Sequence, residues 1–222
     1  MHDRERRAVV NNLLANGIAV AVCPRALRDA RGSALINTRT SEVTMMSTDL
    51  ASGFAETLHV PGPHPSLGRH ADTFGRLIGS WAGEYRDRRP GETEETGTME
   101  VHFGWVLQGL AVQDTWIAPP RPLRAGSPLK RQTYGTTVRV FYPQDETWRA
   151  VWLNPVVGVR TDLIGRRVGD DIVQFCVSVD RPEKWVFSAI TARSFLWRAS
   201  VLADDGLTWQ AVTEFQLHRT AG

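Results

Sequence analysis

Residues 77–85 read Leu-Ile-Gly-Ser-Trp-Ala-Gly-Glu-Tyr, and they mark the point at which the pattern of the chain changes. Before them, apolar residues recur at helical spacing, which predicts a short helix over residues 66–77. From Gly79 onward, apolar residues recur at every second position, which is the period of a half-buried strand. The sequence therefore predicts a short helix followed by a β-rich domain over residues 79–222.

Ten strand-like segments make up this domain, and short connectors separate them. Residues 143–146, 168–171 and 203–206 have the composition of hairpin turns. The longest connector, residues 118–132, contains four prolines and is a candidate lid or portal loop, with a plain solvent loop as the alternative. The predicted strands cover residues 80–87, 98–104, 110–117, 134–142, 147–154, 158–166, 172–179, 185–191, 194–203 and 207–218.

Almost no helical sequence separates these strands, which excludes a parallel sheet because parallel neighbours need long crossover connections. An antiparallel sandwich and a closed barrel remain. Closure removes exposed strand edges, and a barrel of about ten strands leaves room for one small ligand. We therefore expect an all-β fold, an antiparallel up-and-down β-barrel of about ten strands with a short N-terminal helix.

The composition is that of an ordinary soluble globular protein, with 42% hydrophobic and 23% charged residues among 222. The net charge of +2, from 26 basic and 24 acidic residues, is too balanced to indicate nucleic acid or an anionic membrane as a partner. No apolar run is long enough for a membrane span. We expect a cytoplasmic protein whose oligomeric state is open, a homodimer being one option.

Residues 1–46 differ from the rest of the chain: arginines flank a mildly apolar run that asparagines interrupt. We expect an N-terminal extension that is disordered or reflects an over-extended gene start; a poorly packed helix is the alternative. Residues 47–78 would form an extended approach segment, rich in Pro and Gly, and the capping helix. The two cysteines, Cys23 and Cys176, lie far apart in the sequence and are expected to be reduced.

Residues 79–81, Gly-Ser-Trp, resemble the motif that opens the first strand in the calycin superfamily, the lipocalins and their bacterial relatives. Residues 101–114, 134–142 and 148–152 resemble bacterial lipocalin-like proteins in the same way, so that the resemblance covers about residues 66–219. It implies a barrel whose floor is plugged by Trp81, with a late arginine packed over that ring; Arg219 is the candidate. The longer stretch around Trp81 has a weaker similarity to nitrobindin-like barrels, which bind haem.

Alternation along the strands predicts which side chains face a ligand. Eight tryptophans are spread over nearly every strand, and core packing is the simplest explanation for most of them. Charged residues within strands either form a solvated outer face or, less commonly, project into the cavity. The candidate ligand-binding residues are Trp81, Tyr85, Trp105, Gln113, Trp116, Arg139, Trp152, Arg160, Trp197 and Arg198.

The motifs of nucleophilic, phosphate-binding and zinc sites are missing from the sequence, so we expect no metal and no cofactor. The weaker nitrobindin resemblance leaves one further option, haem held by His218. The leading prediction is a soluble barrel that binds a small apolar or amphipathic molecule. The alternative is a cofactor-free cyclase, isomerase or hydratase acting on a terpenoid-like or polyketide-like substrate. In that alternative the acid–base residues would be Asp162, Glu214 and His102.

Overall fold

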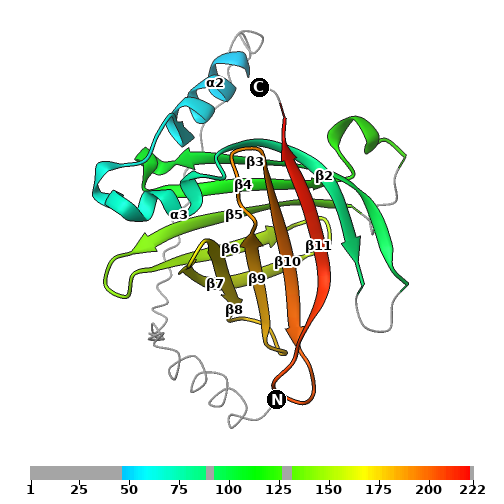
Figure 1. Cartoon of the computed structure of the whole chain (residues 1–222). Helices are drawn as coiled ribbons and strands as arrows, with labels where there is room; N and C mark the ends of the chain where they lie inside the picture. Colours follow the sequence, from blue (N-terminus) through cyan, green and yellow to red (C-terminus); the bar gives the residue numbers. More distant parts are fainter. Residues whose placement is uncertain (1–46, 89–92, 127–131, 221–222) are drawn as a thin grey trace, which may run out of the picture. The chain divides into compact units, whose positions relative to one another are not determined.

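The computed structural model describes residues 47–88, 93–126 and 132–220 (Figure 1). The chain divides into two compact units, residues 1–56 and 57–222. Helix α2 (Ser47–Leu58) carries the chain from the first into the second. We expected an extended segment there, and this part of the prediction is wrong. The predictions for residues 1–46, including Cys23, lie outside the described residues.

In the second unit, the described strands form a closed ten-stranded antiparallel barrel, as predicted. Each strand from β2 to β11 pairs with its neighbours, and β3 pairs with β4 to complete the ring. The two-residue strand β1 (His59–Val60) pairs with the last two residues of β3, beyond the stretch that pairs with β2. The barrel strands are β2 (Gly79–Asp87), β3 (Glu95–Val106), β4 (Ala111–Ala118), β5 (Thr133–Tyr142), β6 (Thr147–Asn154), β7 (Val159–Val168), β8 (Asp171–Cys176), β9 (Glu183–Ser188), β10 (Ser194–Leu202) and β11 (Trp209–Arg219).

The predicted helix before β2 is shorter and less regular than expected. Residues 65–70 form a 3₁₀ turn, η1 (Pro65–His70), and only Ala71–Gly75 is α-helical, as α3. Gly68 takes a positive φ of 49° inside η1, which breaks the run into two pieces. Two further 3₁₀ turns, η2 (Leu107–Gly109) and η3 (Arg121–Leu123), lie in the connectors around β4.

One half of the barrel interior is filled by side chains from α3 and the residues that follow it. Phe74, Leu77 and Trp81 are completely buried there. The Trp81 indole donates a hydrogen bond to the Leu77 carbonyl oxygen at 2.7 Å. The Arg219 guanidinium carbon lies 4.1 Å from the Trp81 ring centroid, which confirms the predicted pairing. We call this filled part the closed half.

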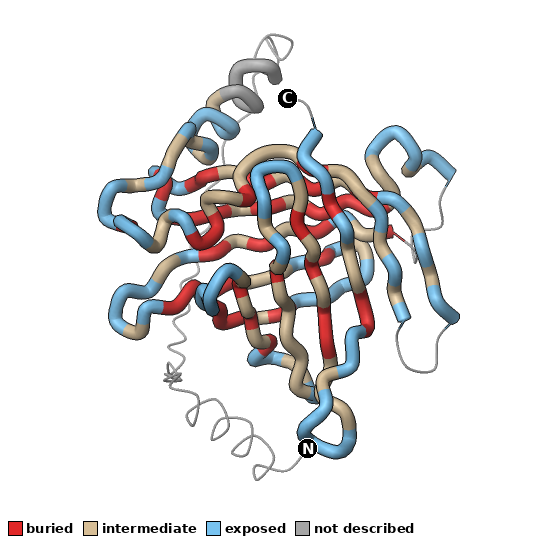
Figure 2. Tube along the Cα trace, in the orientation of Figure 1, coloured by how far each residue is buried: buried red, intermediate tan, exposed pale blue. Residues whose placement is uncertain are grey.

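Alternation along the strands separates an inner from an outer face. On β3, Met99, Val101 and Phe103 are buried, whereas Glu100 and His102 point outward. Figure 2 shows buried residues along the strands and exposed residues mainly in the connecting turns. A register shift between Ala199 and Ser200 is the irregularity in the pairing of β10 with β11.

Candidate functional site

The half of the barrel interior beyond the closed half contains a cavity of about 540 Å³. We call this part the open half. Its walls come from the ends of strands that meet there: Trp116 near the end of β4, Trp152 near the end of β6, and Trp185 near the start of β9. A volume of this size is in the range that holds a single drug-sized molecule.

Six aromatic rings form a connected wall around the cavity. The rings of Trp197 and Phe215 are stacked, with centroids 4.6 Å apart and an interplanar angle of 11°. Such a wall offers a large apolar surface with little side-chain freedom to lose on binding. Neighbouring ring centroids along it are 6.2 Å apart for Trp152 and Trp185, 5.4 Å for Trp185 and Trp197, 5.7 Å for Trp116 and Trp197, 5.4 Å for Trp116 and Phe215, and 6.2 Å for Tyr85 and Phe215.

Two glycines make room for rings of this wall. A Cβ atom on Gly135 would lie 2.2 Å from Cη2 of Trp152. A Cβ atom on Gly97 would lie 2.7 Å from Cε1 of Tyr85. Each glycine therefore lets the ring on the neighbouring strand lie flat across its backbone.

A buried ion pair stands where the cavity meets the closed half. Arg139 lines the cavity, and its Nη1 lies 2.5 Å from Oδ2 of Asp114. The Asp114 side chain is fully buried, and its Oδ1 accepts a hydrogen bond from the Thr137 amide at 2.8 Å. The guanidinium also faces the Phe74 ring, 4.9 Å from its centroid. Charge, hydrogen bonds and ring contacts thus hold Arg139 in one position.

The remaining lining combines small and aliphatic residues with polar and acidic ones. Glu183 accepts a hydrogen bond from the Trp185 indole at 2.7 Å. Asp87 and Glu95 stand directly opposite each other on β2 and β3, and both line the cavity. The uncharged polar residues of the lining are Gln132, Thr133, Thr137, Asn154, Thr161 and Thr213.

Five of the predicted ligand-binding residues line the cavity. They are Tyr85, Trp116, Arg139, Trp152 and Trp197. Sequence reasoning missed Trp185, Phe215 and Glu183, although alternation along β9 places Glu183 and Trp185 on one face.

The other five candidates lie elsewhere. Trp81 and Trp105 are buried in the hydrophobic core of the closed half, away from the cavity lining. Gln113 bonds Thr136 on the outer face. Arg160 and Arg198 also lie outside, where each pairs with a carboxylate. The outer face is where polar and charged strand residues of a barrel are well solvated.

The three predicted acid–base residues also lie on the outer face, which corrects the expectation that they reach a substrate inside the barrel. Asp162 pairs with Arg160 at 3.0 Å, and Glu214 pairs with Arg198 at 2.5 Å. His102 points away from the interior, so it does not approach Asp114. His218, the candidate haem ligand, is likewise exposed on β11, beside the buried Leu217.

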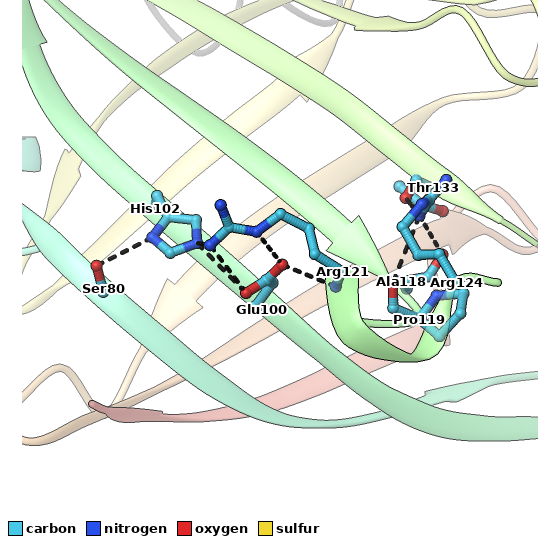
Figure 3. Close-up of polar contacts among 8 residues, drawn as sticks. All are labelled: Ser80, Glu100, His102, Ala118, Pro119, Arg121, Arg124 and Thr133. Atoms are coloured by element: carbon cyan, nitrogen blue, oxygen red, sulfur yellow. Dashed lines mark hydrogen bonds and ion pairs between the residues drawn. The ribbon is translucent and has the colours of Figure 1, made fainter. Parts of the chain in front are cut away.

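His102 belongs to a polar cluster that joins β2, β3 and the connector after β4 (Figure 3). Its Nδ1 lies 2.9 Å from the Ser80 hydroxyl, and its Nε2 lies 3.4 Å from Nη2 of Arg121. The same Nε2 lies 3.6 Å from Oε2 of Glu100, so a guanidinium donor and a carboxylate acceptor both face this nitrogen.

Two arginines anchor the ends of the long connector after β4. Arg121 binds Glu100 through its Nε at 2.7 Å and through its backbone amide at 2.9 Å. Arg124 donates to the carbonyl oxygens of Ala118, at 3.3 Å, and Thr133, at 3.0 Å, on the two sides of the connector (Figure 3). Ala118 and Thr133 both line the cavity, so these bonds fix part of its wall.

No protein-family model matches the chain, and no curated protein matches it in sequence. Among solved structures, Rv2717c from M. tuberculosis is similar, with a TM-score of 0.50 and 18% identity over 72% of this chain and 99% of that one. The S-type phycobiliprotein lyase CPES from Guillardia theta has a TM-score of 0.46 and 13% identity over 68% of this chain and 92% of that one. The first likeness, together with the ten-stranded antiparallel barrel, fits a calycin, lipocalin-like fold.

The described helices are all too short or too polar to cross a bilayer.

Proposed function

We propose that the barrel binds one small, mostly apolar molecule in the cavity of the open half. The observation that carries this proposal is the connected wall of six aromatic rings around a space of about 540 Å³. Ligand sites typically combine such apolar walls with a few polar groups that fix orientation. Here the fixed Arg139 and the polar residues at the ends of the strands supply those groups.

The alternative function, a cofactor-free cyclase, isomerase or hydratase, is not supported by the positions of its three candidate acid–base residues. Asp162, Glu214 and His102 all lie on the outer face, and the first two are bound to neighbouring arginines. A general acid or base must come within hydrogen-bonding distance of the proton that it transfers. Side chains outside the barrel wall do not meet this requirement for a substrate held inside.

The first test of the proposal is whether the purified protein contains a bound small molecule. Native mass spectrometry and solvent extraction of the protein purified from its own host should show a co-purifying molecule of defined mass. The expected compound is mostly apolar and of drug-like size, as the cavity volume requires.

A matched pair of variants ties the ligand to the cavity. Ala199 lines the cavity, whereas Ala211 is exposed on the neighbouring strand. Ala199→Phe should therefore fill the cavity and abolish binding of the neutral fluorophore N-phenylnaphthylamine, while Ala211→Phe should leave binding unchanged. Equal binding by both variants, with intact thermal unfolding, would show that the cavity is not the binding site.

A further inference from the structure

The charged groups that line the cavity are mostly negative. Among the described lining residues Asp87, Glu95 and Glu183 are acidic, and Arg139 is the one cation. The Arg139 guanidinium already forms the buried ion pair with Asp114. By contrast, no described cation forms an ion pair with Glu95 or Glu183. The excess of negative charge in the lining attracts a cation and repels an anion.

The three acidic residues lie at one end of the barrel. Asp87 is the last residue of β2, whereas Glu95 begins β3 and Glu183 begins β9. Because neighbouring strands of the barrel are antiparallel, these positions share the same end. Asp87 and Glu95 are also direct partners across β2 and β3, an arrangement in which like charges repel each other. The negative charge is therefore concentrated at the end of the cavity that lies away from the closed half.

Glu183 stands beside a corner of the aromatic wall. Its carboxylate accepts the hydrogen bond from the Trp185 indole at 2.7 Å, which holds it next to that ring. The Trp185 ring is steeply inclined to its neighbours, with interplanar angles of 81° to Trp152 and 63° to Trp197. Rings at such angles form a corner and not a flat stack. We call Trp152, Trp185 and Trp197 the aromatic corner; all three line the cavity together with Glu183.

Aromatic rings with a carboxylate beside them are suited to a positively charged amine. The face of an indole ring carries partial negative charge, and tryptophan is the aromatic residue that attracts cations most strongly. Several rings that face one small volume are the usual means of binding a quaternary ammonium group. Here Glu183 supplies the opposite charge. A ligand carboxylate at the same place would instead meet a like charge.

We propose that the ligand is a cationic amphiphile, an apolar molecule that carries one protonated amine or quaternary ammonium group, and that Glu183 and the aromatic corner bind this group. The apolar body of the ligand then lies against the remaining rings of the open half. This inference rests on the proposed function, because it names the chemical class of the molecule that the cavity holds.

The test compares three probes on one ring system: naphthylmethyl-trimethylammonium, neopentylnaphthalene and naphthylacetate. The first two have the same shape and differ in charge, because a carbon atom replaces the nitrogen; the third is an anion. We expect equilibrium dialysis to show that the wild-type protein binds the cation at least roughly tenfold more tightly than the anion. The neutral probe reports the apolar contribution alone.

The variant Glu183→Gln removes the charge but keeps an oxygen that can accept the Trp185 hydrogen bond. It should weaken binding of the cation roughly tenfold and leave binding of the neutral probe and the melting temperature unchanged. The control Glu84→Gln removes the same charge from the exposed outer face of β2, outside the cavity lining, and should alter none of these quantities.

The outcomes separate the two proposals. If the wild-type protein binds the anion as tightly as the cation, or if Glu183→Gln weakens the cation no more than Glu84→Gln does, the inference is wrong, while binding of the neutral probe still supports the proposed function. The comparison of cation and anion needs no variant, so it decides the case even if Glu183→Gln does not fold. If neither these probes nor N-phenylnaphthylamine bind the wild-type protein, the proposed function itself is contradicted, and the inference with it.

Discussion

Trp81 belongs to the sequence motif that predicts the fold, and its side chain forms the floor of the barrel. Its ring is fully buried between Arg219 and the core, and its indole bonds Leu77. We expect Trp81→Ala to lower the free energy of unfolding by about 3–5 kcal/mol, because a large buried ring leaves a cavity when truncated. Urea unfolding followed by circular dichroism measures this. A loss of a few tenths of a kcal/mol would show that the floor does not depend on this ring.

Cys176 is a free, buried cysteine on the inner face of β8. Burial, and then the negative charge of Glu183, raise the pKa of its thiol far above the ordinary value of 9.0. Because the thiolate is the reactive form, Cys176 should not react with a disulfide reagent at pH 8 while the protein is folded. In a Cys23→Ser background, one thiol should react on unfolding in urea. Rapid reaction of the folded protein would contradict the burial.

The charged residues show where prediction from single positions fails. Alternation correctly identifies the two faces of a strand. It does not show which face a charged residue occupies when both faces contain polar as well as apolar residues. Asp162 lies between the buried Thr161 and Leu163, so the outward direction of its side chain follows from theirs. Asp114 and Arg139 are fully buried instead, because they form an ion pair inside the barrel. Pairing between strands, which one sequence does not show, decides such cases.

At the scale of elements, the connector after β4 is fastened to the barrel by the Glu100–Arg121 pair. The hydrogen bond from the Arg121 side chain is the largest cause that holds the pKa of Glu100 below its ordinary value of 4.5. A carboxylate with a depressed pKa in the folded state stabilises that state above its ordinary pKa. The contribution is then lost as the pH falls through the lower, folded-state pKa.

The Arg121 backbone amide reports this titration directly, because it donates to Oε1 of Glu100 at 2.9 Å. Its amide chemical shift in NMR spectra should therefore titrate with a midpoint below pH 4.5. In Glu100→Gln the same amide should show no titration in this range. A midpoint at or above 4.5 in the wild-type protein would mean that the ion pair does not persist in solution.

The barrel strands were the most predictable elements, and the helices the least. All ten strands follow from period-two alternation bounded by turn residues, with ends that differ by a few residues. Helix α2 was not predicted, because the prolines of residues 61–65 favour an extended segment and this prediction was applied to all of residues 47–65. The signal for it was nonetheless present: Leu50, Phe54 and Leu58 recur at every fourth position.

At the scale of the whole molecule, the position of the cavity depends on what fills the other half of the barrel. Trp81, Trp105 and Trp197 all face inward, and nothing in their local sequence distinguishes core from cavity wall. The distinction arises because Phe74 and Leu77 occupy the closed half. Predicting the site thus required the packing of α3 against the barrel, which is tertiary information.

The core of the barrel is contained within one stretch of the chain. Every residue of the main hydrophobic cluster lies between Leu67 and Leu217, and the compact unit that holds them spans residues 57–222. We therefore expect a fragment of residues 57–222 to fold and to unfold at the same temperature as the full chain, because it keeps every described side chain of this cluster. Differential scanning calorimetry of both proteins provides the measurement. If the fragment melted well below the full chain, residues 1–56 would contribute to the stability of the barrel, against the expectation of a mere extension over residues 1–46.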